Sequence, residues 1–255
     1  MSQLQKSKYL ESMMGDTIAQ IRCDLDNGRS VLFCGTPCQV AGVWHAIGEH
    51  EHLILCDFIC HGVPSAEIFR DYILRKLRKN ECLTGLDFRP KDAGWSSKNI
   101  RLNISTTTTT TTTPYALDPF YKGFMTDNAF LRRSCYDCQY RDTHYSDITI
   151  ADFWGYQKLD PALNDEKGLS LIVANTTRGR AAVEGLTNFE LHKIDNKFSD
   201  YAFAPKDYSG FLKTREQFYA CYSDGKLKNA ALKTYMKDYY IRWAKYYIKK
   251  ALRRA

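Results

Sequence analysis

Nine cysteines stand in this 255-residue chain, and their positions indicate where its chemistry lies. Cys38 follows Gly35, Thr36 and Pro37 in the stretch LFCGTPCQV, where an apolar run gives way to an expected helix. Glycine permits the turn, threonine can cap the helix and proline suits its first position. Free N–H groups and the helix dipole stabilise a thiolate there, so Cys38 is a candidate nucleophile or metal ligand.

Three further cysteines occupy comparable positions. Cys60 ends the apolar run LILCDFIC at a strand-to-turn junction, and Cys135 and Cys138 form a CxxC pair. Two sulfurs at this spacing can reach one metal or cluster, so with Cys38 these residues would make a closed set of four thiolates. The cysteines in apolar or helical settings are expected to be ordinary core residues: Cys23, Cys56, Cys82 and Cys221.

The cysteine spacing leaves three kinds of site open. Zinc and an iron–sulfur cluster both accept four thiolates, so a redox protein and a zinc-stapled interaction module are compatible with the same residues. A thiol-dependent enzyme would need Cys34 or Cys38 beside a histidine. Cys60 and His61 could supply half of such a pair, although neighbouring residues on a strand point to opposite faces.

The order of the elements predicts how these residues are positioned. Alternating strands and helices indicate an α/β protein, with α+β as the other possibility, in which helices flank a mixed sheet and a long basic helix ends the chain. Strands are expected at 30–34, 53–59, 84–89, 99–105, 147–153, 169–175 and 189–194, and helices near 37–48, 65–79, 117–126, 178–187, 211–222 and 227–252.

The first two strands are the ones that concern the cysteines. If 30–34 and 53–59 are parallel neighbours joined by the 37–48 helix, their following turns open on the same sheet edge. Cys38 and Cys60 could then meet. The run Thr106–Thr113 is of low complexity, and we expect a hairpin or mobile loop without chemistry there.

Composition limits the class of protein. With 44% hydrophobic and 25% charged residues the chain is typical of globular proteins, and it lacks an apolar run of membrane-spanning length. Its first residues are too polar for a secretory signal, so we expect a cytoplasmic protein with reduced thiols. Without a GxGxxG fingerprint a standard Rossmann cofactor site has no support. We expect a cluster-binding domain at 1–205 and a helical segment at 206–255.

The basic charge is concentrated at the C-terminus. Residues 226–255 hold ten Lys and Arg against one acid, Asp238, whereas the whole chain has a net charge of only +7. We expect Tyr239, Trp243 and Tyr246 to pack on the body and to leave mainly charge exposed. Such a surface would attract an acidic electron-carrier protein, with an anionic membrane as the weaker alternative and nucleic acid disfavoured.

Five motifs together resemble one known family. GTPCQ (35–39), CHGVPS (60–65), FRPKDAGW (88–95), SCYDC (134–138) and DITIADFWG (147–155) resemble, in the same order, the beta subunits of the coenzyme F-420 hydrogenase/dehydrogenase family. With the opening KYLESMMGDT the resemblance covers most of residues 8–175. It implies an iron–sulfur flavoprotein that passes electrons between a 4Fe-4S cluster, FAD and a diffusible acceptor, which is the deazaflavin coenzyme in archaeal members.

The resemblance also implies which residues serve the cofactors. The cysteines of its motifs are the cluster ligands, and they fall on Cys38, Cys60, Cys135 and Cys138. Gly35, Thr36 and Gln39 are candidates to approach a flavin or the cluster, and Arg89, Lys91 and Asp152 are candidate polar contacts, with turn formation and surface ion pairs as the alternatives. The resulting prediction is an iron–sulfur, flavin-linked oxidoreductase subunit that relays electrons to a deazaflavin or other small-molecule acceptor.

The chain departs from the family pattern in three places. Many members carry a ferredoxin-like, cysteine-rich segment before the motif strand, where this chain has about 30 residues. It therefore looks like the C-terminal part of a longer design, and we expect a ferredoxin-type donor or a separate ferredoxin-like subunit as partner. Arg133 stands where proline is expected and Ala151 where glycine is usual, and neither change removes a thiolate.

Overall fold

The chain forms two compact units that interleave along the sequence. Unit 1 comprises Met1–Glu11, Gly62–Asp137 and Asp207–Ala255, and unit 2 comprises Ser12–His61 and Cys138–Lys206. The expected boundary at 205/206 lies outside the described residues, and the C-terminal helices belong to unit 1. The computed structural model describes residues 9–96, 99–141, 143–156, 167–194, 208–222 and 226–252.

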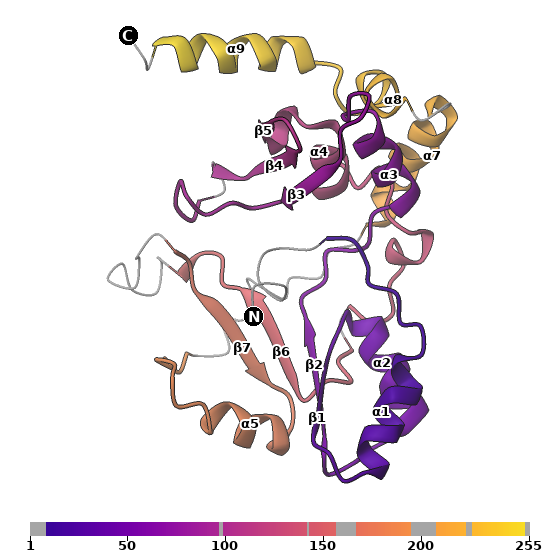
Figure 1. The fold of residues 1–255 in the computed structure, drawn as a ribbon, viewed down its shortest axis with the longest axis vertical. Coiled ribbons are helices and arrows are strands. Elements are labelled where there is room, and N and C mark those ends of the chain that lie inside the picture. Colours follow the sequence, from indigo (N-terminus) through magenta and orange to yellow (C-terminus); the bar gives the residue numbers. More distant parts are fainter. Residues whose placement is uncertain are drawn as a thin grey trace. The chain divides into compact units, whose positions relative to one another are not determined.

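Unit 2 is built on a four-stranded mixed sheet, whose strands lie side by side in the order β1-β2-β6-β7 (Figure 1). The first three strands are parallel, and β7 runs antiparallel to β6. The elements are α1 (Thr17–Asp26), β1 (Val31–Cys34), α2 (Pro37–Ile47), β2 (Leu53–Phe58), β6 (Ile148–Asp152), β7 (Ser170–Ala174) and α5 (Thr177–Glu184). The predicted parallel pairing of the first two strands is confirmed.

The core of unit 2 is a small cluster between α1, α2 and β2. It holds Ile21 and Leu25 from α1, Val40 and Val43 from α2, and Leu53 and Leu55 from β2. Helix α1 was not predicted, although Ile18, Ile21 and Leu25 recur at helical spacing and could have revealed it.

Unit 1 contains an antiparallel sheet in the order β3-β4-β5 and most of the helices of the structure (Figure 1). Its elements are α3 (Ala66–Leu74), β3 (Leu83–Asp87), β4 (Arg101–Thr106), β5 (Thr110–Pro114), η2 (Tyr115–Leu117), α4 (Pro119–Met125), η3 (Arg133–Cys135), η7 (Ser209–Phe211), α7 (Leu212–Cys221), α8 (Leu227–Lys233) and α9 (Tyr239–Leu252). The threonine run forms the end of β4, the turn and most of β5, so the predicted hairpin, and not the alternative of a mobile loop, is confirmed.

The core of unit 1 is aromatic. Phe120 of α4 is fully buried, and its ring centroid lies 4.9 Å from that of Phe69 and 5.4 Å from that of Phe130. Tyr72 and Phe88 pack on the same ring. Such rings bury large apolar areas, so this cluster joins α3, α4 and the antiparallel sheet into one body.

Two expected elements differ from the structure. The predicted strand at 189–194 is irregular chain. The predicted helix at 227–252 is two helices, because the chain turns between them to bury Met236 and to let the Tyr235 hydroxyl donate to the Pro119 carbonyl at 2.8 Å. The α/β fold class with a mixed sheet is confirmed. Across the residues that the structure describes, none of the helices has the length and apolar character needed to cross a membrane.

Candidate functional site

The candidate residues of unit 2 gather at one edge of its sheet. Strands β1, β2 and β6 are parallel, so their carboxyl ends share one edge. Cys38 follows β1 by four residues, Cys60 follows β2 by two, and Asp152 is the last residue of β6. The two cysteine turns therefore open on the same sheet edge, as the sequence predicted.

The turn before Cys38 is held by its own side chains. Thr36 N–H donates to Gln39 Oε1 at 3.0 Å in a capping box, and Gln39 Nε2 donates to the Ser12 carbonyl at 2.9 Å. A Cβ at Gly35 would lie 3.0 Å from the Phe33 ring, so a larger residue there would require that ring to shift. The contacts give Thr36 and Gln39 a structural role, and their role toward a cofactor stays a prediction.

Cys38 lies beside the cap of α2. Its Sγ is 3.2 Å from Thr36 Oγ1, and it occupies the first turn of the helix, whose first residue is Pro37. The Thr36 hydroxyl itself donates to Gln39 Oε1 at 3.1 Å. The predicted place of Cys38 at a helix start is confirmed, and its role as a nucleophile or metal ligand stays a prediction.

Within unit 1, the residues that follow Cys60 and His61 pair with the chain that leads to Cys135. Gly62, two residues after Cys60, has a φ of +121°, and a Cβ there would lie 3.4 Å from Cys135 Cβ and 3.0 Å from Leu131. The Arg132 N–H donates to the Val63 carbonyl at 2.8 Å, and Pro64 bridges to Leu131. The CHGVPS motif is therefore paired with the chain that leads into SCYDC.

The four predicted ligands are half-buried cysteines, and none of them forms a disulfide. Cys38, Cys60 and Cys138 belong to unit 2 and Cys135 to unit 1, so the CxxC pair spans a point where the chain passes between units. In the described ranges no three His, Cys, Asp or Glu side chains are grouped so as to hold a metal ion. The assembly of all four thiolates stays a prediction.

Arg89 and Lys91 lie together in unit 1. The Arg89 guanidinium is 4.3 Å and the Lys91 Nζ 4.8 Å from the centroid of the Trp95 ring. A ring face between two cations orders both of them. These two candidate contacts are thus brought together, and the candidates Gly35 and Asp152 belong to unit 2.

Sequence reasoning missed a thiol pair beside the site. Cys34 and Cys56 are direct partners in the register of β1 and β2. A hydrogen bond with the Cys56 thiol lowers the pKa of Cys34 from 9.0 to about 7. The same hydrogen bond and burial raise the pKa of Cys56. Cys56 is buried as predicted, but it also tunes an exposed thiol. The parallel pairing of the two strands was the available signal.

A buried acid on β2 was also missed. Asp57 is fully buried, its Oδ2 lies 2.8 Å from His144 Nδ1, and its Oδ1 accepts from Thr149 Oγ1 at 2.5 Å. A carboxylate on one ring nitrogen fixes the orientation of the imidazole. An acid inside the apolar run LILCDFIC was the sequence signal for this network.

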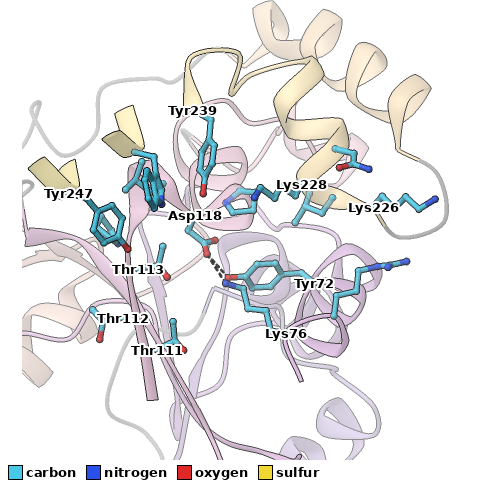
Figure 2. Close-up of a pocket in the computed structure, with 17 residues that line it drawn as sticks. Tyr72, Lys76, Thr111, Thr112, Thr113, Asp118, Lys226, Lys228, Tyr239 and Tyr247 are labelled. Atoms are coloured by element: carbon cyan, nitrogen blue, oxygen red, sulfur yellow. Dashed lines mark hydrogen bonds and ion pairs between the residues drawn. The ribbon is translucent and has the colours of Figure 1, made fainter. Parts of the chain in front are cut away.

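Unit 1 also contains a cavity of about 510 Å³ between α3, β5, α8 and α9. Figure 2 shows Tyr72 and Lys76 directed at Asp118, whose buried carboxylate accepts from the Tyr72 hydroxyl and caps α4. Tyr239, Trp243 and Tyr247 of α9 form the opposite wall. No pattern singled out this cavity, because residues from six elements, η2 and α4 among them, form it.

These features define a mixed α/β protein with cysteine-bearing turns at the carboxyl edge of the parallel strands of its sheet. A family model that describes the C terminus of the coenzyme F420 hydrogenase/dehydrogenase beta subunit matches residues 28–197, about two thirds of the chain. The chain belongs to this family, whose members' name marks them as subunits of redox enzymes, and the predicted resemblance is confirmed. A search of the curated proteins found no match.

Proposed function

We propose that this chain is an iron–sulfur, flavin-linked oxidoreductase subunit that relays electrons between a ferredoxin-type donor and a deazaflavin or other small-molecule acceptor. The observation that supports it best is the pairing within unit 1 of Val63 and Pro64 with Leu131 and Arg132, because these residues follow Cys60 and precede Cys135 by only a few positions. Family membership over residues 28–197 supports the redox class.

The donor set suits a 4Fe-4S cluster. Cys38, Cys60, Cys135 and Cys138 are outside any disulfide and neither fully buried nor fully exposed, and four thiolates are the usual ligand set. When bound, the cluster would accept and donate single electrons. The capping box of Thr36 and Gln39 would fix the helix start that carries Cys38, and the positive φ at Gly62 would hold the turn after Cys60 against Leu131.

Other residues of the chain would serve the flavin or the acceptor. Arg89 and Lys91, ordered by the Trp95 ring, offer cations to the anionic part of such a molecule. Gly35, Thr36, Gln39 and Asp152 are the candidates from the sheet edge of unit 2. FAD is the expected flavin, because the family resemblance implies it.

The test is metal analysis of anaerobically purified protein and of single variants. We expect brown protein with iron and sulfide, and loss of its visible absorption in Cys38→Ser, Cys60→Ser, Cys135→Ser and Cys138→Ser. Cys82→Ser and Cys221→Ser are the matched controls and should keep the absorption. Colourless protein with one zinc would instead support the interaction module, and metal-free protein inactivated by thiol alkylation would support a thiol-dependent enzyme.

A further inference from the structure

Helix α9 has an inner and an outer side within unit 1. Tyr239, Trp243 and Tyr247, four residues apart in sequence, line the cavity, which places this stripe toward η2, β5 and α8 (Figure 2). Two of the three residues expected to face the body, Tyr239 and Trp243, line this wall, and Tyr247 does so in place of Tyr246. Trp243 and Tyr247 are still 45% exposed, so the wall is partly open to water. The prediction that the helix leaves mainly charge exposed is wrong, because aliphatic side chains are exposed on its other side.

The outer side carries an aliphatic stripe. Ile241 and Ile248 are each 61% exposed and Leu252 is 73% exposed. At 3.6 residues per turn, positions seven and eleven residues after Ile241 fall within about 20° of it. Three large aliphatic side chains thus form one exposed row, which is uncommon on a surface that faces only water.

Cations flank this row. Lys245 and Lys249 follow Ile241 by four and eight residues, which turns them about 40° and 80° from the stripe on the same side. Both lysines are exposed, and α9 contains neither Asp nor Glu. Arg242 is already paired with Asp238, so the two lysines carry the unneutralised charge beside the stripe. A short helix with an aliphatic row, flanking lysines and tyrosines is typical of helices that lie in a membrane interface.

The charge pattern selects among the surfaces that could cover this row. A second copy of the chain would bring lysine-rich helices together, and like charges repel. Binding to an acidic protein would explain the exposed lysines. It would not explain why Ile241, Ile248 and Leu252 are exposed beside them. An anionic membrane satisfies both, because acyl chains accept the row and phosphates accept the lysines.

We propose that α9 binds peripherally to membranes that contain anionic lipids. The helix, about 21 Å long, lies in the plane of the interface with Ile241, Ile248 and Leu252 toward the acyl chains and Lys245 and Lys249 at the phosphates. This proposal reverses the order of partners expected from the sequence. It is independent of any cluster or flavin, because every residue that it uses lies beyond the family match.

The test is sedimentation of the full chain with vesicles. We expect binding to phosphatidylcholine vesicles that contain phosphatidylglycerol, little binding to pure phosphatidylcholine, and weakening as salt rises. Lys245→Gln with Lys249→Gln should weaken binding roughly thirtyfold, because each surface lysine contributes about fivefold. Ile241→Ser with Ile248→Ser and Leu252→Ser should weaken it by roughly tenfold or more.

A matched control comes from unit 2, where Phe189→Ser, Leu191→Ser and Lys193→Gln also remove exposed apolar and basic groups. This triple variant should bind as the unaltered chain does. Circular dichroism should show the same fold in all variants, since the altered side chains are exposed. Failure of the unaltered chain to bind anionic vesicles at low salt would overturn the proposal. The proposal would also be overturned if the unaltered chain were a dimer that dissociates in the serine variant. It would likewise be overturned if the chain bound no vesicles and the lysine variant lost ferredoxin-dependent reduction.

Discussion

The two units stabilise themselves in different ways. Among the described residues, the hydrophobic cluster of unit 1 holds eighteen buried side chains, many of them aromatic, whereas that of unit 2 holds six aliphatic ones. Of the nine buried polar side chains among the described residues, six belong to unit 2, including Asp57, Asp147 and Thr149, and three belong to unit 1. A unit held by apolar contacts tolerates little change in volume, and a unit held by polar contacts tolerates little loss of a partner.

The difference suits the roles that we assign to the units. The turns that carry Cys38 and Cys60 stand at the edge of the sheet of unit 2, where the Cys34 thiol is exposed. Unit 1 supplies an aromatic body that holds Gly62 against the chain leading to Cys135. Three experiments test this difference between the units.

The largest effect is expected in the aromatic core. Phe120→Ala should lower the free energy of unfolding by about 3–5 kcal/mol, because Phe120 is fully buried among Phe69, Tyr72 and Phe130. Denaturant titration would measure the loss, and hydrogen exchange would locate it. Protection should fall in unit 1 and persist in β1, β2 and β6.

Phe189→Ala is the control for this variant. Its side chain is 66% exposed, so the change should alter the free energy of unfolding by less than about 0.5 kcal/mol. Equal loss of protection in both units would break the comparison.

A smaller effect is expected in the polar network of unit 2. Asp147 is buried and accepts from the Leu55 N–H at 2.9 Å, from Thr176 Oγ1 at 2.7 Å and from Arg178. Asp147→Ala should lower the free energy of unfolding by about 2–3 kcal/mol. This is less than the loss expected when one partner of a fully buried ion pair is removed, because the Arg178 side chain is 31% exposed and can reach water.

Asp147→Asn is the control for this variant. It keeps a carbonyl acceptor and should cost less than the alanine variant in the same denaturant titration. A cost of less than about 0.5 kcal/mol for Asp147→Ala would show that the polar contacts do not hold unit 2.

The smallest effect concerns the thiol pair. With its pKa lowered to about 7 by the Cys56 thiol, Cys34 is about half thiolate at neutral pH. A thiolate of lower pKa is a weaker nucleophile, so its gain over a thiol of pKa 9.0 in disulfide exchange is about five- to eightfold. Cys56→Ala should remove that gain and move the pH midpoint of Cys34 labelling from near 7 toward 9.

Mass spectrometry of the Cys34 peptide, after timed reaction with an aromatic disulfide, would measure the rate. Cys23→Ala, which removes an exposed thiol of the same unit, is the control and should leave the Cys34 profile unchanged. An unchanged midpoint in Cys56→Ala would mean that the pair does not tune Cys34, and the reactive chemistry would then rest on Cys38 alone.

Local signals in the sequence determined much of the candidate site. An apolar run, a glycine that permits the turn, Thr36 as cap and Pro37 at the first helical position are enough to predict β1, the turn and α2. The order strand–helix–strand suggested parallel pairing of β1 and β2 as a condition for the site, and the structure meets that condition. The five ordered motifs were enough to predict the family. Each of these inferences depends on residues close together in sequence.

Tertiary structure decided what depends on distant partners. Asp57 and His144 are far apart in sequence, and only the placement of β6 beside β2 brings their neighbourhoods together. The turn between α8 and α9 depends on the burial of Met236 and on the bond from Tyr235 to Pro119, so helical periodicity alone predicted one continuous helix. The exposure of Ile241, Ile248 and Leu252 likewise depends on packing, because the opposite side of α9 lines the cavity. Periodicity shows that a helix has faces, but only packing decides which face is buried.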